Sequence, residues 1–151
     1  MGYIEQNLIQ GEQIRYYTKL HWIVFIFPIF LIVIGFCLAF VFSLYSAALI
    51  LGTLFFLVGV LLGVPRFITY KSSEFAVTNK RVLIKVGFIK RHSLELLLQK
   101  VEGIGVDQDF SGRIFGYGTI IVTGTGGTKE PFKKIANPLE FRKQVEQSIS
   151  Q

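Results

Sequence analysis

The sequence predicts a two-helix membrane hairpin followed by a small, mainly-β domain that ends in an α-helix. Two observations predict this fold class. Positions 20–65 of the 151-residue chain contain no Asp, Glu, Lys or Arg, and a run of that length is roughly twice what one membrane-spanning helix needs. After position 65 the pattern changes to short alternating apolar runs separated by Gly and Asn, which is typical of antiparallel strands.

The apolar run is expected to form two transmembrane helices, at about 22–42 and 46–64, on either side of a polar break at 43–46. This divides the chain into an N-terminal juxtamembrane segment (1–21), a transmembrane hairpin (22–66) and a cytoplasmic domain (67–151). Basic residues flank the hairpin, and none lies in the break; they are Arg15, Lys19, Arg66 and Lys71. Because cytoplasmic loops are enriched in Lys and Arg, both termini are expected in the cytoplasm.

Small residues share one face of each expected helix. Gly35 and Ala39 are one turn apart in the first helix, and Gly52, Gly59 and Gly63 share a face of the second. Such faces let two helix backbones approach closely. They are expected either to pack the two helices of the hairpin together or to form a homo-oligomer. Neither helix carries the charged groups that ion or proton transport requires.

The soluble part is expected to hold about six or seven short strands and a terminal helix. Strands are expected at 75–78, 81–86, 89–96, 101–106, 119–123 and 128–134, with a β-leaning segment at 14–17 and a helical turn at 109–115. The terminal helix should begin with Asn137 as its cap and Pro138 in its first position. Phe141, Val145 and Ile149 then form an apolar stripe that covers an open end of the sheet or barrel.

Basic residues gather around a hairpin whose turn is expected at Gly87 and Phe88. A two-residue turn there pairs Lys85 with Lys90, on the face that also carries Arg81. Like charges that face each other in a sheet favour a nearby anion or ample water. The candidate anion-facing or lipid-facing residues are Lys80, Arg81, Lys85, Lys90, Arg91 and His92. Solvated surface is the alternative, because basic surface strands are common.

The residue types that catalysis or metal binding needs are scarce. His92 is the single His after position 65, Cys37 is the single Cys of the chain, and Glu95 points to the opposite face of the strand from His92. No enzyme activity, metal site or cofactor is therefore expected. The Gly-rich turn at 124–127 lacks the ending and the following helix of a phosphate loop. Nucleic acid is not an expected partner, because the basic residues alternate with apolar strand positions and lack aromatic neighbours for base stacking.

Several stretches carry a resemblance to a known family. They are SEFAVTNKRV at 73–82, GYGTIIV at 116–122 and IANPLEF at 135–141, with 8–12 and 20–22 near the start. They resemble the bacterial pleckstrin-homology (PH)-like membrane proteins. The resemblance implies a PH-like split β-barrel capped by the C-terminal helix, on the cytoplasmic side of the bacterial inner membrane, with no enzyme activity. Eukaryotic PH domains often bind phosphoinositides through a basic loop between their first two strands. The first clear turn here, at Asn79 and Lys80, is too short for that specificity to be carried across.

Two function classes follow. In the first, the chain is a membrane-anchored, non-enzymatic interaction module that recruits or assembles a protein partner, or a second copy of itself, at the cytoplasmic face. In the alternative, the basic strand face binds anionic lipid headgroups. The net charge of +6 is consistent with this alternative, since 14 Lys or Arg stand against 8 Asp or Glu after position 65. The resemblance favours the first class, because bacterial PH-like domains lack a uniform lipid-binding signature.

Overall fold

The computed structural model describes residues 3–41, 45–88 and 91–150. It contains two compact units. One is the helical hairpin, Trp22–Lys71, and the other, which we call the β domain, joins Met1–His21 to Ser72–Gln151. The segment 1–21 is therefore part of the β domain and not a separate juxtamembrane segment, because it supplies a strand to one of the sheets.

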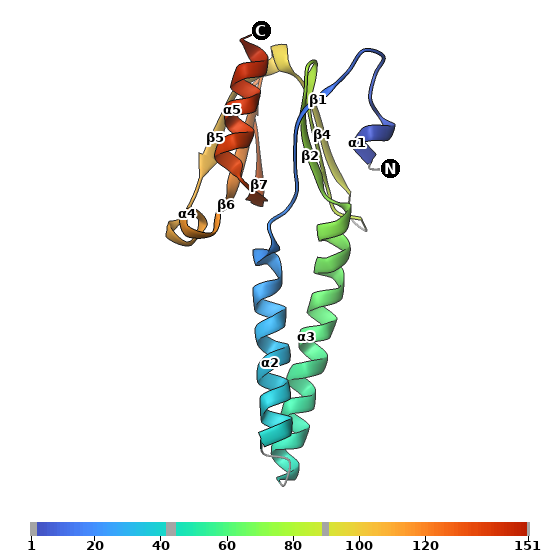
Figure 1. Cartoon of the computed structure of the whole chain (residues 1–151), viewed down its shortest axis with the longest axis vertical. Helices are drawn as coiled ribbons and strands as arrows, with labels where there is room; N and C mark the ends of the chain where they lie inside the picture. Colours follow the sequence, from blue (N-terminus) through green and yellow to red (C-terminus); the bar gives the residue numbers. More distant parts are fainter. Residues whose placement is uncertain (1–2, 42–44, 89–90, 151) are drawn as a thin grey trace. The chain divides into compact units, whose positions relative to one another are not determined.

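The helical hairpin consists of a 3-10 turn (Trp22–Phe25) and two α-helices, α2 (Ile26–Val41) and α3 (Ser46–Ser72) (Figure 1). The segments Trp22–Val41 and Ser46–Ser72 are long and apolar enough to cross a membrane, with mean hydropathies of 3.0 and 2.6 over 18-residue windows. α3 continues beyond the end expected near residue 64. Pro65 removes one backbone donor inside the helix, and Arg66 Nη1 donates a hydrogen bond to the Leu62 carbonyl at 3.0 Å. Residues 42–44 of the expected break lie outside the described residues.

The small residues of the hairpin lie where α2 and α3 pack together. A Cβ added at Gly35 would stand 2.5 Å from a backbone nitrogen of the facing helix. A Cβ added at Gly52 would stand 2.6 Å from the backbone nitrogen of Ala39. A Cβ at Gly59 would stand 2.7 Å from a facing side chain, whereas one at Gly63 would meet nothing closer than 3.6 Å. These glycines therefore lie at contacts inside the hairpin, and the approach is closest at Gly35 and Gly52.

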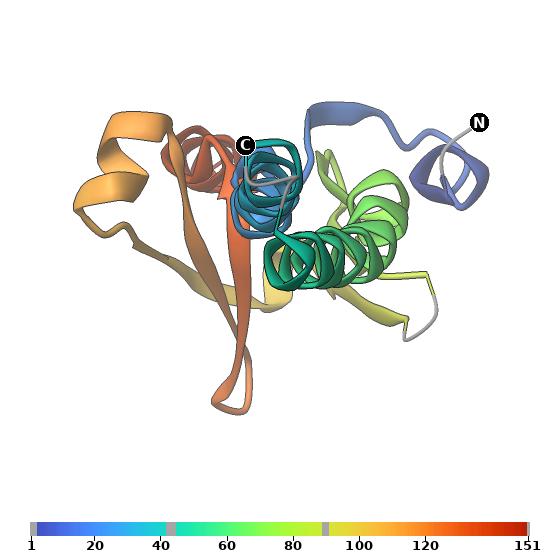
Figure 2. The ribbon, with the colours of Figure 1, turned by 90° about the horizontal axis from the view of Figure 1, so that it is seen from below.

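The β domain holds a four-stranded and a three-stranded antiparallel sheet (Figure 2). The first has the order β1 (Ile14–Thr18), β2 (Glu74–Thr78), β3 (Arg81–Val86), β4 (His92–Leu97). The second has the order β5 (Val101–Asp107), β6 (Tyr117–Gly124), β7 (Thr128–Ala136). The helices of the domain are α1 (Tyr3–Gln6), α4 (Phe110–Phe115) and α5 (Pro138–Ile149), and a 3-10 turn, η2 (Leu98–Lys100), leads from β4 to β5.

The two sheets do not close into a continuous barrel within the described part of the chain. β4 and β5 belong to different sheets, with η2 between them. On the other side, the extension of β1 meets β7 at one isolated bridge, Leu20 with Ile135. The expected strands and terminal helix are confirmed, and the expected split barrel takes the form of two separate sheets.

The connection between the first two strands is the helical hairpin itself. β1 pairs with β2 through Thr18 and Phe75, although residues 22–71 lie between them in the sequence. The turn at Asn79 and Lys80, which the sequence suggested as the first, therefore joins the second strand to the third. The chain thus enters the hairpin from β1 and leaves it toward β2, and these two strands are neighbours in the sheet.

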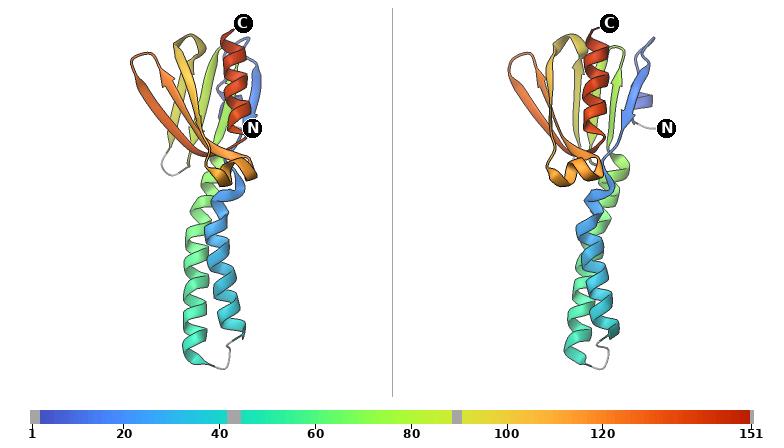
Figure 3. Two further views of the ribbon diagram at one scale, coloured as in Figure 1. Left: turned by 90° about the vertical axis from the view of Figure 1, so that its left-hand side faces the viewer. Right: turned by 60° about the vertical axis from the view of Figure 1, so that its left-hand side comes forward.

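The core lies between the two sheets and α5, which packs against β1, β2, β5 and β6 (Figure 3). Phe141 and Val145 are fully buried, as the apolar stripe predicts, while Ile149 stays 45% exposed. Asn137 is at the cap position of α5 and Pro138 is at its start, as predicted, but the Asn137 side chain makes no cap hydrogen bond. Its backbone takes the left-handed conformation, at φ 50°, and its N–H donates to the Gly116 carbonyl at 2.9 Å.

The predicted register of the β3–β4 hairpin is wrong. Lys85 pairs with Ser93 and Val86 with His92, so the connection spans 87–91 and is not a two-residue turn. The Gly87 N–H donates to Ser73 Oγ at 3.1 Å and does not close a tight hairpin. Lys90, the expected partner of Lys85, lies outside the described residues.

Candidate functional site

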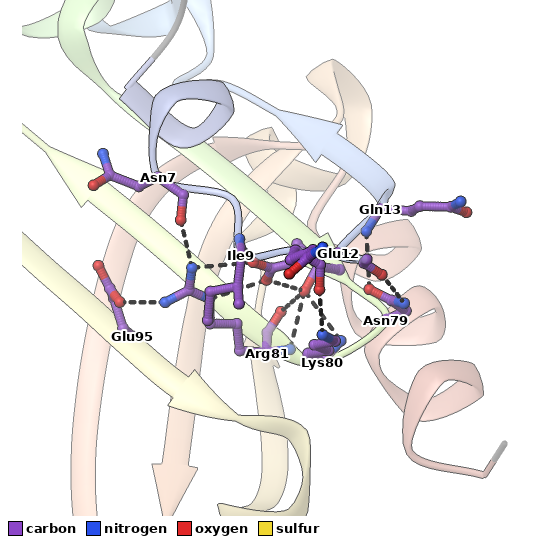
Figure 4. Close-up of polar contacts among 11 residues, drawn as sticks. Asn7, Ile9, Glu12, Gln13, Asn79, Lys80, Arg81 and Glu95 are labelled. Atoms are coloured by element: carbon purple, nitrogen blue, oxygen red, sulfur yellow. Dashed lines mark hydrogen bonds and ion pairs between the residues drawn. The ribbon is translucent and has the colours of Figure 1, made fainter.

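Arg81, a predicted anion-facing residue, is buried in an ion pair with Glu12 (Figure 4). Its Nε lies 3.0 Å from Glu12 Oε1 and its Nη2 lies 3.0 Å from Glu12 Oε2, which is a bidentate geometry. Nη1 donates to Glu95 Oε2 at 2.7 Å, and Nη2 also donates to the Asn7 carbonyl at 2.6 Å. The prediction that Arg81 faces an external anion is wrong, because the chain itself supplies two carboxylates.

The Glu12 side chain has no exposed surface. Burial alone would raise the pKa of Glu12, but hydrogen bonds from Arg81, from the Ile9 N–H at 2.8 Å and from the Thr78 hydroxyl at 2.8 Å lower this pKa below its ordinary value. The hydrogen bond to Glu12 in turn raises the pKa of Arg81. Both groups are therefore charged at neutral pH, and together they hold the segment 7–13 against the β2–β3 hairpin.

The N-terminal segment covers the face of β3 that carries Arg81 and Lys85. Ile4 of α1 is buried against Leu83, which lies between these two residues on the same face. The Lys85 ammonium lies 4.2 Å from the centre of the Tyr3 ring, close enough for a cation–π contact. This face of β3 is therefore an internal contact of the β domain.

The other residues of the predicted anion-facing group lie in different places and have different contacts. Lys80 Nζ donates to a backbone carbonyl of the N-terminal segment at 2.8 Å. The Arg91 guanidinium lies 6.0 Å from the centre of an aromatic ring in its own loop. His92 Nε2 lies 2.5 Å from Glu130 Oε2 on β7, and Lys90 is not among the described residues. The described members of the predicted group do not form one basic face.

A groove of about 420 Å³ opens where the β2–β3 turn, the end of β4 and the end of α5 meet. We call it the distal groove; it is lined by Asn79, Lys80, Leu97, Leu98, Gln99, Ser148 and Ile149. Leu97 and Ile149 are 47% and 45% exposed and supply apolar surface, while Lys80 and Gln99 supply polar groups. A volume of a few hundred Å³ with mixed lining suits a small ligand or a few side chains of a partner.

The distal groove lies at the end of β2 that is away from Ser72, the first residue of the β domain after the helical hairpin. The chain returns from the hairpin at Ser72, next to the start of β2 at Glu74, and β2 ends at Thr78 beside the groove. A strand of this length spans roughly 15 Å. Sequence reasoning missed the groove, because its lining comes from three distant segments that meet only when α5 packs on the sheets.

Comparison with known proteins confirms the resemblance. The sequence matches the family described as "Bacterial PH domain" over residues 22–149, which is most of the chain and includes the helical hairpin. The chain belongs to this family. No curated protein matches it. A solved structure, that of a DUF1696-family protein with a pleckstrin-homology domain from Shewanella loihica PV-4, is similar with a TM-score of 0.42 and 13% identity, over 53% of this chain and 73% of that chain.

Among the described residues, no three His, Cys, Asp or Glu side chains are grouped as a metal ion would require. The family match begins at residue 22, so β1 and Glu12 lie before it. No local signal could have identified Glu12 as the partner of Arg81, because the two residues are 69 positions apart.

Proposed function

We propose that this bacterial PH domain protein is a non-enzymatic interaction module, anchored in the bacterial inner membrane by residues 22–71, that recruits or assembles a protein partner at the cytoplasmic face. The insertion of the apolar hairpin between β1 and β2 carries this proposal. Both hairpin ends attach to neighbouring strands, so a membrane that holds the hairpin also holds the β domain at its surface. The β domain then lies in the cytoplasm with its distal groove, where a soluble or membrane-bound partner can reach it.

The cytoplasmic orientation is supported by the basic residues that flank the hairpin. Arg15 and Lys19 precede the first apolar helix, and Arg66 and Lys71 lie near the end of α3. Lys and Arg concentrate on the cytoplasmic side of spanning helices. Both termini belong to the β domain, so they share that side.

A protein partner fits the distal groove better than a headgroup fits β3. Leu97 and Ile149 offer apolar surface to a partner side chain, and Lys80, whose ammonium donates to a backbone carbonyl of the N-terminal segment, is also in the groove lining. A segment with one apolar side chain and a nearby carboxylate would match this chemistry. Headgroup binding through the β3 face does not enter the proposal, because Arg81 is engaged by Glu12 and Lys85 by Tyr3.

Site-specific photocrosslinking of the full chain in native membranes tests this function. A photoreactive phenylalanine analogue at Leu97 or at Ile149 should give a discrete protein adduct. The same probe at Glu102, which is exposed on β5 and is not in the groove lining, is the control. An adduct of twice the chain's mass identifies the partner as a second copy. Absence of protein adducts at both groove positions, or an equal adduct at Glu102, would contradict the proposal.

A further inference from the structure

α4 carries an exposed apolar face. Phe110 is 82% exposed and Ile114 is 63% exposed, and residues four apart lie on the same side of a helix. Phe115, at the end of α4, is 49% exposed. Single exposed apolar side chains are common on protein surfaces, but here two lie on one side of a six-residue helix and a third lies at its end. Exposed apolar residues that gather in this way are typical of interaction sites.

The local structure holds α4 in place. Asp109 caps the helix by accepting a hydrogen bond from the Gly112 N–H at 2.6 Å. Gly116 ends it in the left-handed conformation, at φ 76°, where a side chain would be strained. Gln108 Nε2 donates to the Tyr117 carbonyl at 2.9 Å and ties the start of α4 to β6. The apolar face is therefore presented by a fixed turn.

α4 lies against the residue that precedes the apolar hairpin. The His21 side chain hydrogen-bonds the backbone of Phe115, and its ring centre lies 5.5 Å from that of Tyr117. The His21 N–H donates to the Lys134 carbonyl at 2.7 Å. Trp22, the next residue, begins the first apolar segment, and consecutive Cα atoms are about 3.8 Å apart. α4 is thus tied to the position where the chain enters the hairpin.

Exposed basic residues accompany the apolar face. Arg113 lies on α4 itself, Lys134 accepts the His21 hydrogen bond through its backbone, and Lys19 binds the Ala136 N–H through its carbonyl at 3.0 Å. All three side chains are exposed. Apolar residues with a basic rim are the composition of segments that lie in the interface of an anionic membrane.

We propose that Phe110 and Ile114 insert into the lipid–water interface of the membrane that holds the hairpin. α4 is then a second, interfacial anchor that fixes which side of the β domain faces the lipid. Inserted segments of this kind reach about 5–10 Å into the headgroup and acyl boundary. The inference rests on the membrane anchoring given under Proposed function, and it is independent of the partner at the distal groove.

Tryptophan fluorescence of the full chain in vesicles tests the inference. Trp22 is the single Trp, so a Trp22→Phe background allows one reporter at a time, as Phe110→Trp or Ile114→Trp. Both positions are exposed, and the substitutions add little strain. In vesicles containing anionic lipid, both reporters should emit at shorter wavelength than a tryptophan exposed to water. They should lose intensity when the lipid is brominated near the top of its acyl chains.

Leu97→Trp in the same background is the matched control, because Leu97 is also exposed but lies in the distal groove. Its emission should be insensitive to brominated lipid. If the chain floats with the vesicles and the Phe110 and Ile114 reporters match this control, the inference is overturned and the anchoring stands. Blue-shifted emission that brominated lipid does not quench would also overturn it, since protein would then cover α4. A chain that fails to float overturns the anchoring and this inference together.

Discussion

The Arg81 guanidinium makes its polar contacts with other groups of the β domain. It forms a bidentate pair with Glu12, reaches Glu95 and binds the Asn7 carbonyl. The Glu12 side chain is fully buried, whereas Glu95 is 41% exposed. The Glu12 pair therefore carries most of the energetic consequence, because solvent screens the exposed partner.

Replacing Arg81 by Met should lower the free energy of unfolding by about 3–5 kcal/mol, because it leaves the Glu12 carboxylate buried without its cation. Thermal or denaturant unfolding of the purified chain in detergent measures this. Lys80→Met, one residue away and exposed, is the matched control and should change stability by about 0.5 kcal/mol or less. Equal effects of the two substitutions would show that the buried pair contributes nothing specific.

The difference between the parent and Arg81→Met should depend on pH. In the parent the folded-state pKa of Glu12 is below its ordinary value of 4.5, so this group stabilises the fold above pH 4.5 and the contribution is lost as pH falls through the folded-state pKa. In the variant, Arg81 no longer offsets the effect of burial, so the pKa of Glu12 is expected to rise. Protonation of Glu12 in acid then removes the unpaired buried charge that destabilises the variant. The stability gap should be widest near pH 7 and should narrow in acid. If the stability gap is the same at pH 7 and in acid, the gap arises from packing alone.

Residue-level prediction from the sequence succeeded where the determining contacts are local. Phe141 and Val145 were placed in the core by helical spacing, and both are fully buried. The sequence predicts a basic face at Arg81 because the expected two-residue turn brings Lys85 and Lys90 to the same face. Its true environment depends on Glu12 and α1, which come from the other end of the chain, and no local pattern contains that information.

At the level of elements, the hairpin helices pack through glycine contacts of unequal tightness. A Cβ added at Gly52 would stand 2.6 Å from the Ala39 nitrogen and 2.7 Å from the Gly35 carbonyl oxygen, both of which are backbone atoms. Backbone atoms cannot rotate away as a side chain can. Gly63 has only ordinary contact distance available around it.

Gly52→Ala should therefore destabilise the hairpin by about 1–3 kcal/mol, the usual cost of overpacking, while Gly63→Ala should be close to neutral. Both substitutions add one methyl group to a helix, so they share the same change in helix propensity. The melting temperatures of the two variants, measured by thermal aggregation in the same detergent, compare their stabilities directly. Similar melting temperatures for both would mean that the helices separate enough to accept the methyl group at Gly52.

A helix or strand could be predicted where the residues that determine it are close together in the sequence. The turn-forming stretch that begins at Asp109 and the helix start at Pro138 indicated α4 and α5 from neighbouring residues alone. The β3–β4 register could not be obtained in this way. A glycine at residue 87 fits a two-residue turn, but Ser73 takes its N–H, and this contact comes from the segment where the chain leaves the helical hairpin.

At the scale of the whole molecule, the β domain is discontinuous in sequence. Ile4 and Leu20 come from before the helical hairpin, and both are buried in a domain whose other strands come after it. β1 completes the first sheet beside β2. We therefore expect the domain to need both sides of the hairpin to fold, so that residues 71–151 alone are not equivalent to it.

Two soluble forms of the chain test this requirement. In the first, a flexible Gly/Ser linker of about ten residues, with a mean span of roughly 17 Å, replaces 22–71 and joins His21 to Ser72. In the second, the chain begins at Lys71. The linked form should unfold cooperatively, because Thr18 and Phe75 are already paired on adjacent strands, which lie about 4.8 Å apart in a sheet.

The form that begins at Lys71 lacks Ile4 and Leu20 and uncovers Leu83, and burial of each such side chain contributes about 1.5–3 kcal/mol. The total is comparable with the roughly 5–15 kcal/mol that stabilises a typical domain. Arg81 loses Glu12 as well, although water then solvates it. The truncated form should show weak or absent cooperativity in urea and little protection of β2 amides from hydrogen exchange. If instead it unfolds at the same urea concentration as the linked form, β1 and α1 are additions to an independently stable domain, and the strand insertion serves attachment to the hairpin alone.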